Sequence, residues 1–110
     1  MMSRRRRFWG FGYEDAGPGP AETDQLRALV TAYFEGAPLS EVAVPRVADL
    51  SLRAPRVQPS SAVAALCTSD PFERASHTYG KAFRDVVRAL ARDFAHAPDL
   101  VAYPRDEHDL

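Results

Sequence analysis

Hydrophobic residues recur at helical spacing in two stretches of the chain. In residues 21–35 they stand three and four positions apart, the spacing of one face of an α-helix, and residues 81–94 repeat that spacing more strictly. Both stretches are therefore predicted to be helices. Gly36 follows the first where a C-terminal cap is expected, and Pro38 follows it. The two apolar faces consist of Leu26, Leu29, Val30, Tyr33 and Phe34, and of Phe83, Val86, Val87, Leu90, Ala91 and Phe94.

Residues 37–59 separate these regions and lack a regular pattern. Pro38, Pro45, Pro55 and Pro59 interrupt the segment, and its apolar residues alternate only loosely. This favours extended segments that lie across another surface over strands of a sheet. Such a long irregular connector is unusual in a small domain and would be explained if it wrapped a larger body.

Two shorter helices are predicted after the connector. Residues 60–68 can form one, capped by Ser60 or Ser61. Residues 69–79 start again with Ser69 or Asp70 as the cap and a proline at the first helical position. A glycine at position 80 allows a break before the next helix.

The last segment, residues 98–110, has the pattern of half a βα unit. Leu100–Tyr103 is an apolar run of strand length, Pro104 ends it, and Asp106 can cap a following helix. No other segment is a convincing partner for this strand, so we expect the chain to be the front piece of a larger protein. An unpaired strand would support this hypothesis, whereas good burial of Leu100, Val101 and Tyr103 would favour a free-standing domain.

The predicted fold class is a mostly α fragment with an extended, proline-rich connector. Its one terminal β-strand would begin a truncated α+β domain. The chain has 110 residues, enough for one small domain, and 45% of them are hydrophobic, which argues against disorder.

Charge and cysteine content narrow the possible functions. The formal net charge of −1 gives no overall attraction to nucleic acid. Cys67 is the only cysteine, which suits a reducing compartment, and no apolar run reaches the length of a membrane span. The Arg4–Arg7 run lacks the apolar core of a signal peptide after it. We therefore expect a cytoplasmic protein.

The first twenty residues form an arm rich in arginine and aromatic side chains. The aromatic residues of FWGFGY, residues 8–13, should pack against another part of the protein. The G-x-G within this tract lacks the third glycine, the preceding strand and the following helix of a dinucleotide fingerprint. The four arginines before it are either a solvated tail or a weak site for anionic surfaces.

Other candidate residues allow a functional and a structural interpretation. Lys81, Arg84, Arg88 and Arg92 form a basic stripe that could meet an acidic surface or a lipid phosphate, or simply be a solvated face.

The histidines and the cysteine give no pattern typical of catalysis. His77, His96 and His108 lack metal-ligand spacing, and His77, near Tyr79, is interpreted as a packing and hydrogen-bonding residue. Cys67 is interpreted as a small buried hydrophobic residue.

The second half of the chain resembles a known family. DPFERASHTYGKAFRDVVRALARDFAHAPDLVAYPRDEHDL, residues 70–110, resembles the start of flavin domains of the vanillyl-alcohol oxidase / p-cresol methylhydroxylase superfamily, above all the alkyldihydroxyacetonephosphate synthase-like branch. There D-R-x-x-H-x-x-G-x-x-x-x-D-x-x-R precedes P-D-x-V-x-x-P, and FWGFGYED, residues 8–15, resembles the W-G-x-G tract of that branch. The matching positions are Arg74, His77, Gly80, Asp85, Arg88, Pro98, Asp99, Val101 and Pro104.

The resemblance implies an FAD-dependent oxidoreductase or alkyl transferase of which this chain is the front part. Residues 1–93 would be a helical lead-in region, and residues 94–110 would begin the PCMH-type flavin domain. The family's Gly-rich phosphate loop and catalytic residues would lie beyond Leu110. We therefore assign no residue here as catalytic, cofactor-binding or metal-binding, and we expect FAD and a small hydroxylated or lipid-like substrate only in the parent protein.

A hypothesis from another class stays open. The chain could be a stand-alone helical module that binds an anionic partner through Arg4–Arg7 and the basic stripe.

Overall fold

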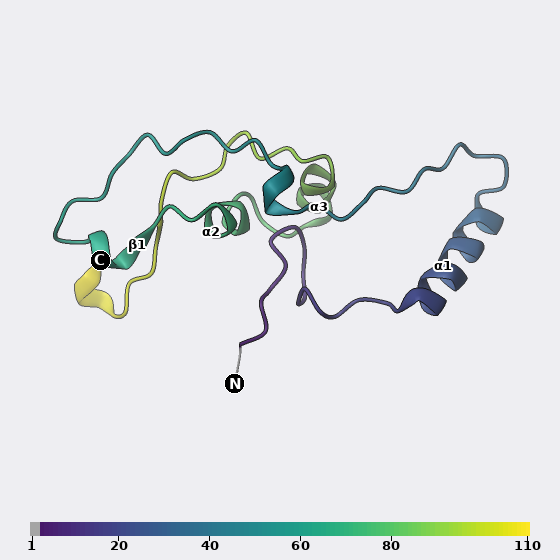
Figure 1. Ribbon diagram of the computed structural model, residues 1–110, viewed down its shortest axis with the longest axis horizontal. Coiled ribbons are helices and arrows are strands. Elements are labelled where there is room, and N and C mark those ends of the chain that lie inside the picture. The colour runs from purple at the N-terminus through teal and green to yellow at the C-terminus, as the bar shows by residue number, and fades with distance from the viewer. Residues whose placement is uncertain (1–2) are drawn as a thin grey trace.

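The protein is elongated, with one helix set apart from the remainder. The computed structural model describes residues 3–110 and measures 58 × 34 × 23 Å, with a radius of gyration of 17.9 Å. A compact domain of this length has a radius of gyration of about 13 Å. Figure 1 shows the reason: helix α1, Pro20–Tyr33, lies at one end and is joined to the rest by two extended tracts.

Helix α1 confirms the helix predicted over residues 21–35. Pro20 occupies its first turn after Gly19, and Glu22 lies where it complements the helix dipole. Gly36 has a φ of +81°, the left-handed conformation that favours glycine after a helix. The helix buries none of its residues, however, so its predicted apolar face is present but uncovered.

The two other α-helices are shorter than predicted. Helix α2 spans Pro71–Ser76, and the Asp70 side chain accepts a hydrogen bond from the Glu73 backbone N–H at 3.2 Å. Helix α3 spans Phe83–Leu90. Tyr79 and Arg92, with φ of +61° and +60°, stand in the turns that follow the two helices, so the reversal after α2 falls on Tyr79 and not on the glycine beside it.

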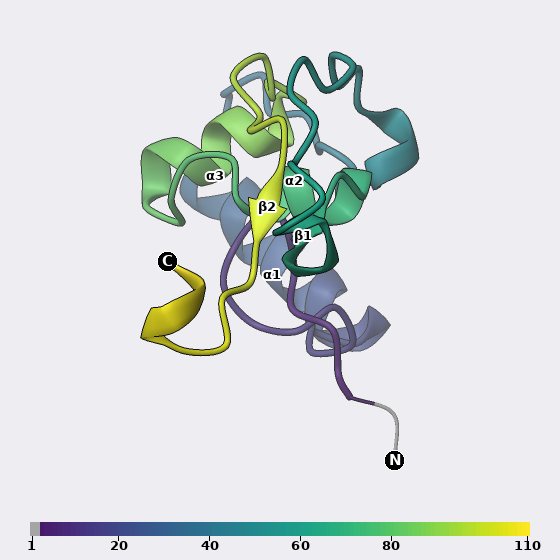
Figure 2. The same ribbon diagram turned by 90° about the vertical axis from the view of Figure 1, so that its left-hand side faces the viewer.

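The predicted strand finds a partner, and this corrects two expectations. Strand β1, Cys67–Thr68, pairs antiparallel with strand β2, Val101–Ala102, and the Tyr103 N–H donates to the carbonyl of Leu66 at 2.9 Å. Residues 60–68 therefore do not form the predicted helix; they hold a 3-10 turn, Ala64–Leu66, before β1. A two-residue ladder depends on a contact between segments that are far apart in the sequence. The residue pattern within one segment does not indicate its partner. Figure 2 shows β2 beside β1.

The pairing and the burial of β2 point in different directions. The strand is paired, so an unpaired backbone does not support the hypothesis that the chain is the front piece of a larger protein. Val101 is buried, at 6% exposed, but Tyr103 is 50% exposed. The segment after β2 forms a further 3-10 turn, Glu107–Asp109, and the Asp106 carboxylate caps it by accepting from the His108 N–H.

A small core lies where the arm meets α2, α3 and the connector. Its buried members are Phe8, Ala75, Ala89 and Phe94, and the ring of Phe8 contacts those of Phe72 and Phe94 at centroid distances of 5.9 and 5.8 Å. The connector contributes Val47, Leu50 and Leu52. It is extended as predicted, apart from one 3-10 turn at Val47–Asp49.

The arm folds back on itself and does not remain a free tail. Arg6 and Tyr13 form an antiparallel bridge, and the Arg7 N–H donates to the carbonyl of Gly12, whose φ is +89°. This turn directs Phe8 into the core while Phe11 stays 75% exposed. The prediction that the aromatic tract packs on another part of the protein is thus confirmed for Phe8. The first two residues of the predicted arm lie outside the described part of the chain.

Within residues 3–110, none of the helices has the length and apolar character needed to cross a bilayer.

Candidate functional site

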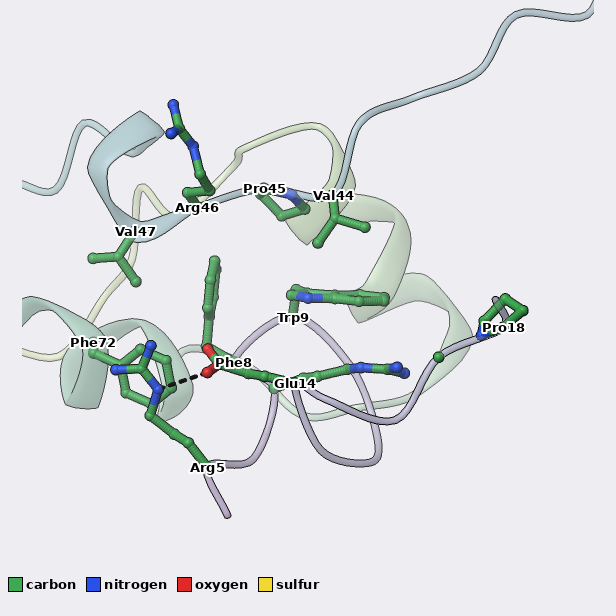
Figure 3. A pocket seen from close by; sticks show the side chains of 12 residues that line it. Arg5, Phe8, Trp9, Glu14, Pro18, Val44, Pro45, Arg46, Val47 and Phe72 are labelled. Atoms are coloured by element: carbon green, nitrogen blue, oxygen red, sulfur yellow. Dashed lines mark hydrogen bonds and ion pairs between the residues drawn. The ribbon is translucent and has the colours of Figure 1, made fainter. Parts of the chain in front are cut away.

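A hollow lies between the arm and the connector. It has a volume of about 700 Å³, and apolar side chains cover most of its wall. Figure 3 shows Phe8 and Trp9 facing Val44, Pro45 and Val47 across it. Its size is that of a ligand pocket, but it contains no nucleophile or base positioned for chemistry.

The arginines of the arm are occupied within the arm. Arg4 forms a bidentate pair with Asp15, at 2.7 Å for the shorter contact, and Arg5 pairs with Glu14 at 2.8 Å, as the dashed line in Figure 3 shows. Arg7 donates to backbone carbonyls and lies over the Trp9 ring. Arg6 is exposed and lies over the Tyr13 ring at 5.5 Å, so the contacts within the arm engage part of the arginine run.

The predicted basic stripe is dispersed in the same way. Lys81 Nζ donates to the carbonyls of Phe8 and Ser76 at 2.7 and 3.2 Å, and burial lowers the pKa of Lys81. Arg88 lies over the Tyr79 ring at 4.7 Å, and Arg92 donates to the carbonyl of Ala43. Three of the four residues of the stripe therefore contact other parts of the chain, whereas Arg84 is exposed. Lys81 also lines a hollow with the four arginines of the arm, and the anion-binding module stays an alternative hypothesis.

The histidines and the cysteine do not form a reactive group. His77 Nδ1–H donates to the Glu73 carbonyl at 2.8 Å, which confirms its interpretation as a hydrogen-bonding residue. His96 packs edge-on against Tyr79. Cys67 is partly buried in β1. In the described part of the chain, no group of three or more His, Cys, Asp or Glu side chains could hold a metal ion.

Three side chains meet at the end of β2. The Tyr103 hydroxyl donates to the Glu73 carboxylate, and its ring packs edge-on against His77 at 5.9 Å. The hydrogen bond to Glu73, together with partial burial and the negative charge of that carboxylate, raises the pKa of Tyr103 to about 12. A tyrosine held protonated in this way is an anchor and not a base at neutral pH.

We expect Glu73→Gln to return the Tyr103 titration towards the usual tyrosine pKa of about 10. The carboxylate favours the protonated phenol, so its removal eliminates the main cause of the shift. Because the shift favours the protonated phenol in the folded protein, its stabilising effect is complete below pH of about 10 and is lost as the pH rises to about 12. Ultraviolet titration of phenolate absorbance, with Tyr103→Phe to assign the signal, measures this shift; identical titrations of the wild type and Glu73→Gln would contradict the contact.

Three of the motif residues in the second half, Arg74, Pro98 and Asp99, take part in a junction between three segments. Arg74 is buried, at 3% exposed, and its guanidinium donates to the carbonyls of Arg53 and Pro98, each at 2.7 Å. No carboxylate pairs with it among the described residues. It therefore joins α2 to the connector and to the turn before β2 by hydrogen bonds alone.

Asp99 completes this junction from the other side. Its carboxylate accepts hydrogen bonds from the Arg56 side chain and backbone, and Arg53 lies 3.6 Å away. The Arg56 hydrogen bond holds the pKa of Asp99 below its usual range. The guanidinium of Arg53 also donates to the carbonyls of Ala95 and Ala97.

Sequence reasoning missed the connector's share in this junction. Arg53 and Arg56 stand three positions apart in a proline-rich tract, which gives no periodic signal. The resemblance of this region to the P-D-x-V-x-x-P motif identified Asp99, but it did not indicate that Arg53 and Arg56 contact its carboxylate.

The fold matches part of an enzyme of the class to which the sequence resemblance pointed. Two matching structures are of alkyldihydroxyacetonephosphate synthase in different crystal forms, with TM-scores of 0.70 and 0.68 at 19% sequence identity in both. Each match covers 94% of this chain, and the chain spans only about a quarter of their length, 24% and 25%. No protein-family model matches the chain. The search of curated proteins finds no match either.

Proposed function

We propose that this chain is the front part of an FAD-dependent enzyme similar to alkyldihydroxyacetonephosphate synthase. Residues 1–93 form the lead-in region that packs on the flavin domain, and residues 94–110 begin that domain. The complete enzyme is cytoplasmic and uses the flavin to oxidise a small hydroxylated or lipid-like substrate, or to exchange an acyl for an alkyl group. This chain supplies none of the reacting groups.

The observation that carries the proposal is the extent of the structural match. Nearly all of this chain corresponds to about a quarter of a larger enzyme. Its elongated shape and the uncovered apolar side chains of α1 add support, because a soluble domain of this size normally buries such residues. Three of the residues that resemble the family motif, Arg74, Pro98 and Asp99, also meet at one junction.

The reading frame after the Leu110 codon tests the proposal. We expect it to continue, directly or after one frame error, into a helix and then a Gly-rich loop, since that loop binds the flavin pyrophosphate in the family. A genuine stop codon followed by unrelated sequence would overturn the proposal.

We also predict that the purified 110-residue chain binds no FAD, whereas the parent polypeptide does. The described residues include no Gly-rich loop at the start of a helix that could hold the pyrophosphate. The measurement is the flavin absorbance that remains after each protein is incubated with FAD and desalted. Near-stoichiometric flavin on the 110-residue chain would contradict this division of roles.

A further inference from the structure

Helix α1 carries an apolar face that is largely exposed in the described chain. Its side chains are exposed to between 45% and 81%, although they have the spacing of a buried face. The same surface continues into the tract after the helix, where Leu39 closes a shallow groove against Leu26 and Val30. The exposed side chains are Leu26, Leu29, Val30, Tyr33, Phe34, Leu39, Val42 and Val44.

The charges around this face define what can cover it. Glu22 belongs to the same face, since it stands four residues before Leu26 and seven before Leu29, and it forms no ion pair within residues 3–110. Arg27 borders the groove beside Leu26 and Val30, and Asp24 and Glu41 bind its guanidinium. The exposed face is therefore apolar, with Glu22 near its N-terminal end and the paired side chains of Arg27 and Glu41 at its border.

Neither a membrane surface nor a second α1 fits that chemistry. Helices that lie on membranes carry lysine and arginine beside the apolar face, whereas the one arginine of α1 is already paired. A parallel pair of α1 helices would bring two Glu22 carboxylates together. An antiparallel pair would place Glu22 beside a last turn that contains no basic residue.

We infer that α1 is a docking helix whose apolar face seats in a groove of the same polypeptide beyond residue 110, with a basic side chain facing Glu22. This inference rests on the proposed function, and it names the contact that holds the lead-in region to the enzyme body. The chain corresponds to about a quarter of the matching structures, so a body large enough to provide the groove is available. The two extended tracts that flank α1 set the helix apart from the small core (Figure 1).

Hydrogen exchange of residues 20–33 measures the docking directly. A free helix of this length is marginal in water, so its amides should exchange with protection of at most about tenfold in the 110-residue chain. In the parent polypeptide we expect protection higher by about a hundredfold or more. The double variant Leu29→Glu/Tyr33→Glu should abolish the gain, while the control variant Ala21→Glu/Ala28→Glu, on the opposite side and outside the groove, should keep it. Glu22→Lys should lower it as well.

The other outcomes overturn the inference in distinguishable ways. A parent that binds FAD but leaves α1 unprotected overturns the docking and leaves the proposed function standing. A parent that binds no FAD overturns the proposed function whatever α1 does. Protection that appears in the 110-residue chain and rises with its concentration assigns the face to a second copy. Protection that appears only with phosphatidylserine vesicles assigns it to lipid. Full protection of residues 20–33 in Glu22→Lys would contradict the inference that a basic side chain faces Glu22.

Discussion

Phe8→Ala is expected to lower the free energy of unfolding by about 3–5 kcal/mol. Phe8 is 4% exposed and contacts Phe72 and Phe94, so its removal leaves a cavity at the centre of a core with few buried side chains. Domains of this size have stabilities of about 5–15 kcal/mol, so the variant should be close to unfolding. Urea titration, followed by circular dichroism and by the fluorescence of Trp9, measures the change.

The arm supplies the matched control for this prediction. Phe11 belongs to the same aromatic tract but is 75% exposed, so Phe11→Ala should change the free energy of unfolding by less than about 0.5 kcal/mol. Equal effects of the two substitutions would contradict the role of Phe8 as the anchor. A change in Trp9 fluorescence without loss of circular dichroism would show that the arm detaches from an otherwise intact core.

Arg74→Ala is expected to lower the free energy of unfolding by about 3–5 kcal/mol. It removes two hydrogen bonds from a charged donor, each of which contributes roughly 1.5–3 kcal/mol. The carbonyls of Arg53 and Pro98 would lose the group that joins them. Arg74→Lys keeps the charge but not the planar fork that reaches both carbonyls, so we expect it to recover less than half of the loss. Urea midpoints of the three proteins measure these differences.

The control for Arg74 is an arginine without such contacts. Arg84 is exposed on α3 and has no hydrogen bond or ion pair to another described residue, so Arg84→Ala should leave the urea midpoint nearly unchanged. If Arg74→Ala were as stable as the wild type, the junction would not hold the three segments together, and the likeness of this region to the family motif would need another explanation.

The helices of this protein were predictable because their signals are local. Apolar spacing, Pro71 at the first helical position and the carboxylate of Asp70 identify α2 and its start without knowledge of the fold. The ends of α3 were less predictable, because the turn at Arg92 lies inside the run of apolar spacing that predicted a longer helix. The pairing of β1 with β2 left no trace in either segment, since each contributes two residues to the ladder.

The candidate sites also combine features that the sequence indicated with features that depend on distant contacts. The sequence indicated clusters of arginine and lysine, but it did not indicate their partners. Arg4 and Arg5 meet Asp15 and Glu14 because the arm turns at Gly12. Lys81 meets the carbonyl of Phe8, which is distant in sequence. Several of the charges that indicated a surface for an anion also make contacts within the chain.

The sequence by itself determined the helical segments, the extended connector and the resemblance to a flavin enzyme. All of these follow from local spacing, from proline and glycine, and from short motifs. Only the tertiary structure decided which apolar faces are covered and which charges are paired, because both depend on contacts between segments that are far apart along the chain. The faces of α1 and α3 have the same helical spacing, yet α3 buries Ala89 against the core and α1 buries none of its residues.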